Sequence, residues 1–208
     1  MKTTACRLCS KPDISILLDL GSQPLCNRYL RGEDENEYTH PLRLGQCGAC
    51  GLVQLDQPPP SGQVLSRFDW ITYREPEGHL DDLADVLSRL PGITAQSVFC
   101  GVTFKDDTLL DRMEKKGFSR RWRLDPKKDL GVDNPRAGLE TIQEKLGPEA
   151  ALKIAGAHGR ADVVIARHIL EHAHDTRRFM EGVKALAAPG GSVVFEAPAC
   201  ERVMEKND

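Results

Sequence analysis

Four cysteines near the start of the chain have the spacing of a metal site. Cys6 and Cys9 form one Cys-x-x-Cys pair, and Cys47 and Cys50 form a second. The two-residue spacing lets both sulfur atoms of a pair converge on one ion, and two pairs supply the four thiolates that tetrahedral Zn²⁺ favours. Four protein ligands leave no open coordination position, so we expect a structural zinc ion. Two redox-active pairs or free thiols are the alternatives.

A second group of polar residues follows a short apolar run. The run, Val-Val-Ile-Ala at 163–166, is typical of a strand buried on both faces of a parallel sheet. Directly after it come Arg167, His168, Glu171 and His172. Ligands in open α/β sheets bind beyond the carboxyl ends of the strands, so these side chains lie where a site would form. The alternative for His172 is a helix-start residue bonded to backbone.

The elements that would position this group are predicted from apolar spacing and from helix caps. Asp175 is a plausible N-cap for the helix that follows, and Pro-Gly-Gly at 189–191 separates that helix from a strand at 192–196. Further upstream, the pattern predicts strands at 97–100 and 121–124 and helices at 80–90, 108–116, 134–146 and 148–155. Strands that alternate with helices indicate the α/β class, with a Rossmann-like, doubly wound parallel sheet.

A proline-rich segment divides the chain. Gln-Pro-Pro-Pro-Ser-Gly at 57–62 cannot continue a strand and is typical of a linker. We therefore expect a small four-cysteine zinc-binding domain at 1–60, built from short strands. A Rossmann-like domain follows at 61–208, and its sheet is expected to be incomplete in this chain.

The turn after the strand at 97–100 is the expected cofactor-binding turn. It holds a single glycine, Gly101, whereas an NAD-dependent dehydrogenase would need a fingerprint of several glycines. We expect Asp107 to cap the following helix. Asp125 stands at the tip of the second strand, close to the position where an acidic residue usually holds ribose hydroxyls. An ordinary turn residue before proline is the alternative for Asp125.

Composition excludes several classes of function. The net charge is −3 and the isoelectric point is near 6.1, so no overall attraction to nucleic acid or to an anionic membrane is expected. No apolar run approaches the roughly 20 residues that span a bilayer, and the first residues lack a signal-peptide core. We expect a cytoplasmic protein with reduced thiols. Cys26, Cys100 and Cys200 are expected to be small packed side chains.

Aromatic and charged residues precede the helix at 80–90. They include Trp70, Tyr73 and His79. Packing of the helix onto the sheet is one interpretation of Trp70 and Tyr73, and a place in a site is the other.

Taken in order, several segments resemble a known family. The segments are CRLC, LDLGSQPLCNRYL, PLRLGQCGACGLVQL, ADVVIARHILEHAHD and PGGSVVFEAP. They resemble class I S-adenosylmethionine-dependent methyltransferases with an N-terminal zinc-binding domain, a group that includes sugar C-methyltransferases acting on nucleotide-linked ketosugars. The resemblance implies that S-adenosylmethionine binds over the carboxyl ends of the strands, near Gly101, Asp125, Arg167 and His168. It also implies that the zinc domain helps to close the substrate pocket.

The resemblance further implies alkylation at carbon. In such a reaction a base removes a proton next to a ketone, and the resulting enolate attacks the sulfonium methyl group. By motif position, Tyr73 and His172 resemble active-site residues of the family. His79 resembles its pocket histidine, which we assign to cofactor binding.

The chain departs from the family pattern in two respects. The glycine-rich turn is reduced to Gly101, and the family's Trp-Glu-Glu-His type segment, which supplies the main base, has no counterpart after Glu196. Because family members are considerably longer, we expect a truncated chain, a split gene product or a remnant, with a C-terminal partner fragment as one source of the missing half.

Three functions follow from these observations. The leading hypothesis is a methyltransferase acting on a small molecule, such as a nucleotide-linked ketosugar. A non-catalytic zinc-containing binding module is the alternative. A zinc-ribbon nucleic-acid binder ranks last, since acidic and basic residues are mixed between Cys6 and Leu55.

Overall fold

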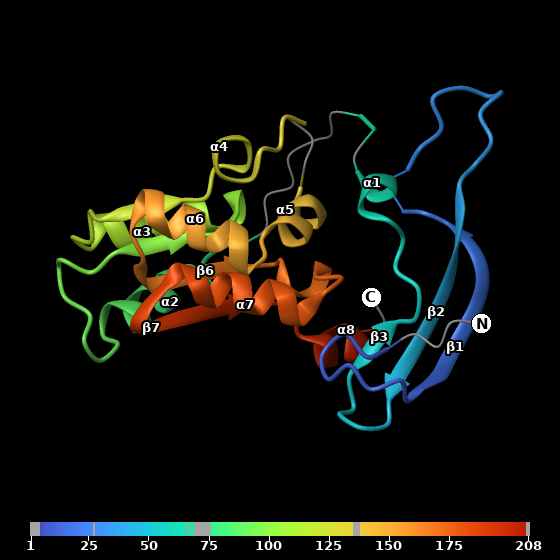
Figure 1. The fold of residues 1–208 in the computed structure, drawn as a ribbon, viewed down its shortest axis with the longest axis horizontal. Helices are drawn as coiled ribbons and strands as arrows, with labels where there is room; N and C mark the ends of the chain where they lie inside the picture. The colour runs from blue at the N-terminus through green and yellow to red at the C-terminus, as the bar shows by residue number, and fades with distance from the viewer. Residues whose placement is uncertain (1–4, 27, 66, 69–75, 135–137, 207–208) are drawn as a thin grey trace.

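The computed structural model describes residues 5–26, 28–65, 67–68, 76–134 and 138–206. Its strands form two separate sheets, which lie in different parts of the molecule (Figure 1). The N-terminal sheet is antiparallel and has the order β1-β2-β3. Its strands are β1 (Ile14–Pro24), β2 (Thr39–Cys47) and β3 (Val53–Leu55), and the short helix α1 (Ser61–Val64) follows them.

The second sheet is parallel and has the order β5-β4-β6-β7. Its strands are β4 (Phe99–Gly101), β5 (Arg121–Arg123), β6 (Ala161–Arg167) and β7 (Ala187–Glu196). The helices are α2 (His79–Ser88), α3 (Asp107–Lys115), α4 (Pro126–Leu130), α5 (Leu139–Lys145), α6 (Pro148–His158), α7 (Thr176–Leu186) and α8 (Cys200–Lys206), with single 3₁₀ turns η1 (Phe104–Asp106) and η2 (Leu170–His172). The α/β class with a parallel sheet is therefore confirmed.

Helices cover both faces of the parallel sheet. Val163 and Ile165 of β6 pack with residues of α2 and α3 in one buried cluster. Val164 and Ala166, which point the other way, pack with residues of α5, α6 and α7 in a second cluster. Because successive side chains of a strand face opposite sides, a strand covered on both sides must be apolar throughout. This explains the continuous apolar run of β6.

The antiparallel sheet has almost no core of its own. Every residue of β1 after Ile14 is exposed, and in β2 only Gly45 and Cys47 are buried. Apolar burial on this scale contributes little to stability, and small domains of this kind usually depend on disulfides or a metal. The fold of residues 14–55 therefore requires a further source of stability.

Several predicted boundaries were wrong. The helix expected from residue 134 begins at Leu139; Asn134 is not helical, and 135–137 lie outside the described residues. Asp107 is the first residue of α3 rather than its cap, and its carboxylate pairs with Arg123 at 2.7 Å. Helix α4 was not predicted, although Asp125 caps it and Pro126 occupies its first turn.

The predictions for the unpaired cysteines were right in one case of three. Cys100 is buried in the core, whereas Cys26 and Cys200 are exposed. Cys200 begins α8, which was not predicted. Among the helices that the structure describes, none has the length and apolar character needed to cross a bilayer.

Two glycines in helix interiors provide a matched test of how closely α7 packs against the turn between α5 and α6. A Cβ at Gly182 of α7 would lie 2.6 Å from the backbone oxygen of Leu146, whereas a Cβ at Gly156 of α6 would meet nothing within 4 Å. Gly182→Ala should lower the free energy of unfolding by about 1–3 kcal/mol through overpacking. Gly156→Ala should raise it by about 0.5–1 kcal/mol. Urea denaturation measures both, and a stable Gly182→Ala variant would contradict this packing.

Candidate functional site

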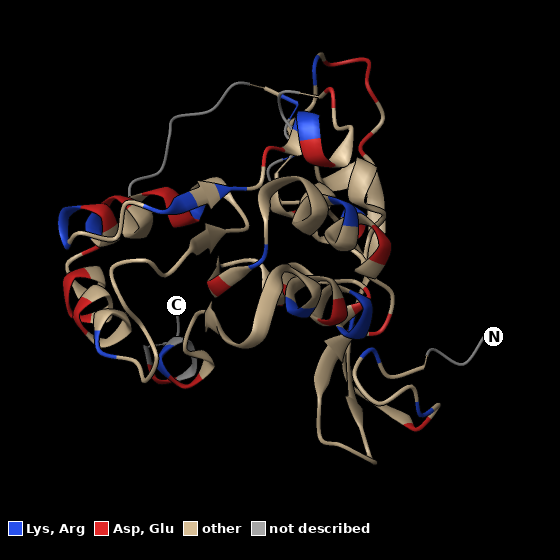
Figure 2. Ribbon diagram, turned by 60° about the vertical axis from the view of Figure 1, so that its left-hand side comes forward, with Lys and Arg blue, Asp and Glu red and all other residues tan. Residues whose placement is uncertain are grey.

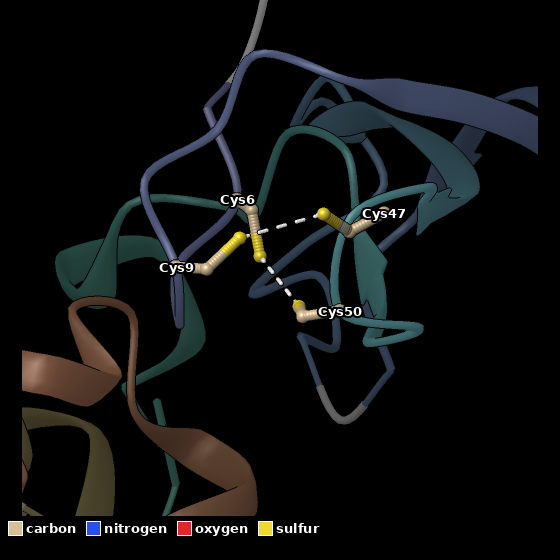
Figure 3. Close-up of side chains that lie close together, drawn as sticks. All are labelled: Cys6, Cys9, Cys47 and Cys50. Atoms are coloured by element: carbon tan, nitrogen blue, oxygen red, sulfur yellow. Dashed lines mark hydrogen bonds between the residues drawn. The ribbon is translucent and has the colours of Figure 1, made fainter.

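The structure brings the four cysteines of the two pairs together. Cys6 and Cys50 have their sulfur atoms 3.6 Å apart, as do Cys9 and Cys47, and the four sulfurs all lie within 4.8 Å of one another (Figure 3). Zn–S bonds of 2.3 Å in a tetrahedron place sulfurs about 3.8 Å apart. The donor set therefore fits a zinc ion, held between the N-terminal loop and the turn that follows β2.

The two cysteine pairs sit in turns of the same form. The Ser10 N–H donates to the carbonyl of Cys6, and the Gly51 N–H donates to that of Cys47. Ser10 and Gly51 both have a left-handed backbone, with φ of 61° and 78°. This repeated turn aims both sulfurs of each pair at one point.

The surroundings of the Cys6 sulfur favour its thiolate form. Burial disfavours its charged form, but hydrogen bonds from the backbone N–H groups of Cys9 and Leu8 and from the thiols of Cys50 and Cys9 lower the pKa to about 6. A thiolate is the form that binds metal. The four-cysteine cluster, together with the weak core of its sheet, supports a structural zinc ion.

The protein purified without chelator should contain about one zinc ion per chain. Cys47→Ser should reduce this content and speed amide hydrogen exchange across residues 14–55, while the core of the parallel sheet stays protected. Cys26→Ser, at an exposed cysteine outside the cluster, is the matched control. A zinc content near zero, or an unchanged exchange pattern in Cys47→Ser, would contradict the structural role.

A buried carboxylate shapes the turn that holds Gly101. Asp106 accepts hydrogen bonds from the backbone N–H groups of Val102 and Thr103 and from that of Arg167 at the end of β6. Burial raises the pKa of Asp106 to about 7, although these bonds act to lower it. A Cβ at Gly101 would lie 2.9 Å from the Asp106 Cβ. Gly101 therefore lets this carboxylate approach the end of β4.

The carboxylate of Glu196, at the end of β7, contacts three of the predicted cofactor-binding residues. Glu196 accepts from the His79 ring at 2.9 Å and from the Arg167 Nε at 2.5 Å, and its Oε1 lies 3.2 Å from His168 Nε2. Desolvation would raise the pKa of Glu196, but Arg167, His79 and His168 together lower it. The parallel register that pairs Arg167 with Glu196 sets these groups side by side.

Arg167 and His168 are held in unusual states. The Arg167 side chain is only 2% exposed, and its guanidinium also donates to the carbonyl of Lys105 and lies 3.6 Å from Glu77. His168 has a positive φ of 51°, which is uncommon for a non-glycine residue. Residues in such backbone conformations are found more often at functional sites. Its backbone N–H donates to the Glu196 carbonyl at 2.8 Å. Strain and burial thus coincide at the carboxyl edge of the sheet.

Asp125 combines two properties at the tip of β5. Its Oδ1 caps α4 by accepting from the Lys127 and Lys128 N–H groups, which lowers its pKa. Its Oδ2 lies 3.9 Å from the Lys128 ammonium, and the side chain is 44% exposed. The capping role found here does not prevent Oδ2 from accepting ribose hydroxyls.

His172 stands apart from the Glu196 group. Its Nδ1 lies 3.1 Å from Glu140 Oε1 of α5, and Glu171 and Lys105 also face it. The Glu140 carboxylate raises the pKa of His172, against the effect of burial. The remaining predicted residue, Tyr73, lies outside the described residues, as does Trp70.

Three of these residues were not assigned from sequence: Asp106, Glu140 and Glu196. Each acts through a partner distant in the chain, such as the 117 positions between His79 and Glu196. Only the position of Glu196, at the end of a predicted strand, could have indicated a role.

The pairing of Glu140 and His172 has a pH-dependent consequence. The folded-state pKa of His172 is raised, so the stabilisation is complete below the unfolded value of about 6.5 and is lost as pH rises through the folded value. Glu140→Gln should lower the pKa of His172 in NMR titration. It should also reduce the free energy of unfolding at pH 6 by less than about 1 kcal/mol, and the reduction at pH 9 should be smaller than that at pH 6. Glu149→Gln is the control. An unchanged His172 titration in Glu140→Gln would rule the pairing out.

Comparison with known proteins shows which domains this chain resembles. Residues 6–64 match a family model described as "Putative zinc binding domain", and residues 106–207 match one described as "Methyltransferase domain". The chain therefore carries a zinc-binding domain followed by a methyltransferase domain. Such a methyltransferase domain implies S-adenosylmethionine as cofactor.

A curated relative has the same order of parts. C-methyltransferase NovU from Streptomyces niveus is 28% identical over 207 residues, which cover 97% of this chain and 49% of NovU. The chain therefore spans about half the length of this relative.

Proposed function

We propose that this methyltransferase uses S-adenosylmethionine to methylate a small molecule at carbon, and that the acceptor is a ketone such as a nucleotide-linked ketosugar. The similarity to a C-methyltransferase over 97% of the chain carries this proposal. It is supported by the group of polar side chains at the carboxyl edge of the parallel sheet, where open α/β sheets bind their ligands.

The residues at this edge fit an adenosyl cofactor. The partly exposed carboxylate of Asp125, whose Oδ2 lies 3.9 Å from the Lys128 ammonium, is suited to the ribose hydroxyls. The turn from Gly101 to Asp106 follows β4, the strand that pairs with β5. His79, Arg167 and His168, which Glu196 holds, border the same edge. The cofactor would supply a methyl group on a positively charged sulfur.

We assign His172 the role of stabilising negative charge on the acceptor. Its raised pKa favours the protonated ring, which donates hydrogen bonds from both nitrogens. With Nδ1 directed to Glu140, Nε2 is the atom available to a developing enolate oxygen. Tyr73 is assigned to the same active site by its motif position alone.

Titration calorimetry with S-adenosylmethionine, and with NADH as a control ligand, tests the proposal. Asp125→Ser keeps a residue that caps α4 but shortens the side chain, so it should weaken binding of S-adenosylmethionine about tenfold. Asp175→Ser makes the same change at the cap of α7 and should leave the affinity unchanged.

Absence of heat with S-adenosylmethionine would favour a second candidate, a zinc-containing module that binds without turnover. The turn at Gly101 favours this candidate, because Asp106 already engages the Val102 and Thr103 N–H groups.

A further inference from the structure

The short helix α4 has little apolar packing to fix its position. It is five residues long, and a helix of this length is not stable by itself. None of residues 126–130, all of which the structure describes, is buried, and three of the five are charged (Figure 2). Leu130 packs against the core but stays partly exposed. Polar contacts must therefore set much of the geometry of α4 and of Asp125, which caps it.

His158 supplies such a contact from the last position of α6. Its Nε2 lies 2.9 Å from Oδ1 of Asp129, and the ring donates because a carboxylate only accepts. The other oxygen of Asp129 accepts from the backbone N–H of Asp125 at 2.8 Å. The Asp129 side chain is only 8% exposed, so water competes little with these two bonds. One carboxylate thus joins His158 to Asp125.

The His158 ring is held in turn by Trp122 of β5. The two rings are stacked, with their centroids 4.7 Å apart and an angle of 14° between their planes. Trp122 pairs with Cys100 of β4 in the parallel register and packs against the core. The contacts therefore run from β5 through the end of α6 to α4, and they return to the tip of β5 at Asp125.

We propose that His158 is a positioning residue for the cofactor: through Asp129 it holds the Asp125 carboxylate in place for the ribose hydroxyls. The ligand in this statement rests on the proposed function, whereas the contacts among the three residues do not. Without the donor on His158, the Asp129 carboxylate could turn toward water and release the Asp125 backbone. Hydrogen bonds weaken steeply when their angles are poor, so a less fixed Asp125 would bind the hydroxyls less well.

Two probes that differ only at the ribose test the proposal on the zinc-loaded chain. Adenosine carries both hydroxyls, and 2′,3′-dideoxyadenosine lacks them. In NMR titrations of the unaltered protein, adenosine should bind about tenfold more tightly, as hydrogen bonds to a carboxylate predict. His158→Phe keeps a ring that can stack on Trp122 but removes the donor, so the preference should fall to about twofold while the affinity for dideoxyadenosine is unchanged. An undiminished preference, or a similar loss of affinity for both probes, would overturn the proposal.

Two further variants separate the hydrogen bond from the ring packing. His158→Gln keeps a donor for Asp129 without the ring and should retain most of the preference. Loss of the preference in His158→Gln as well would assign the effect to the ring and contradict the proposal. His40→Phe is the matched control, because His40 also stacks on an aromatic ring, that of Tyr38, and bonds through Nε2 to the Gln57 carbonyl, but in the antiparallel sheet. It should leave the preference unchanged.

Amide hydrogen exchange separates this inference from the proposed function, because it needs no ligand. His158→Phe should speed exchange of the Asp125 and Lys128 N–H groups about tenfold, while β6 stays protected. Unchanged exchange would overturn the positioning role even in a chain that binds S-adenosylmethionine. Faster exchange without any binding of S-adenosylmethionine would refute the proposed function and, with it, the role of His158 in cofactor binding.

Discussion

The carboxyl edge of the parallel sheet depends on the hydrogen bonds to Asp106. This one carboxylate binds the turn after β4 and the last residue of β6, so it joins the ends of two neighbouring strands. Burial raises its pKa to about 7, because the ionised form loses hydration that its hydrogen bonds replace only in part. Arg167, whose backbone it fixes, then carries the contacts to Glu196 and Lys105.

The antiparallel sheet differs from the parallel sheet because it has almost no apolar core. Its strands bury almost no apolar side chains, so order must come from a few strong local bonds rather than from a core. The cysteine cluster closes the base of the β1–β2 hairpin, where Cys47 ends β2, and Gln54 of β3 binds the backbone of Arg7 beside the first pair. Loss of metal would release both ends of this hairpin together.

Features of the sequence with short-range causes were predicted well. The Cys-x-x-Cys spacing, the apolar run of β6 and the cap of α7 at Asp175 depend on neighbours within a few residues, and each is present. The contacts of Glu196 could not be predicted, because its partners come from α2 and from the end of β6. Asp125 shows a third case, in which one side chain caps α4 through Oδ1 while its Oδ2 pairs with Lys128.

The left-handed backbone of His168 limits which residues can replace it. Glycine and asparagine adopt this conformation at least cost, and β-branched residues adopt it worst. Glycine would relax the chain but remove the ring that faces Glu196, whereas asparagine would keep both the turn and a short polar group. Among functional relatives, variation at this position should therefore be confined to histidine and asparagine.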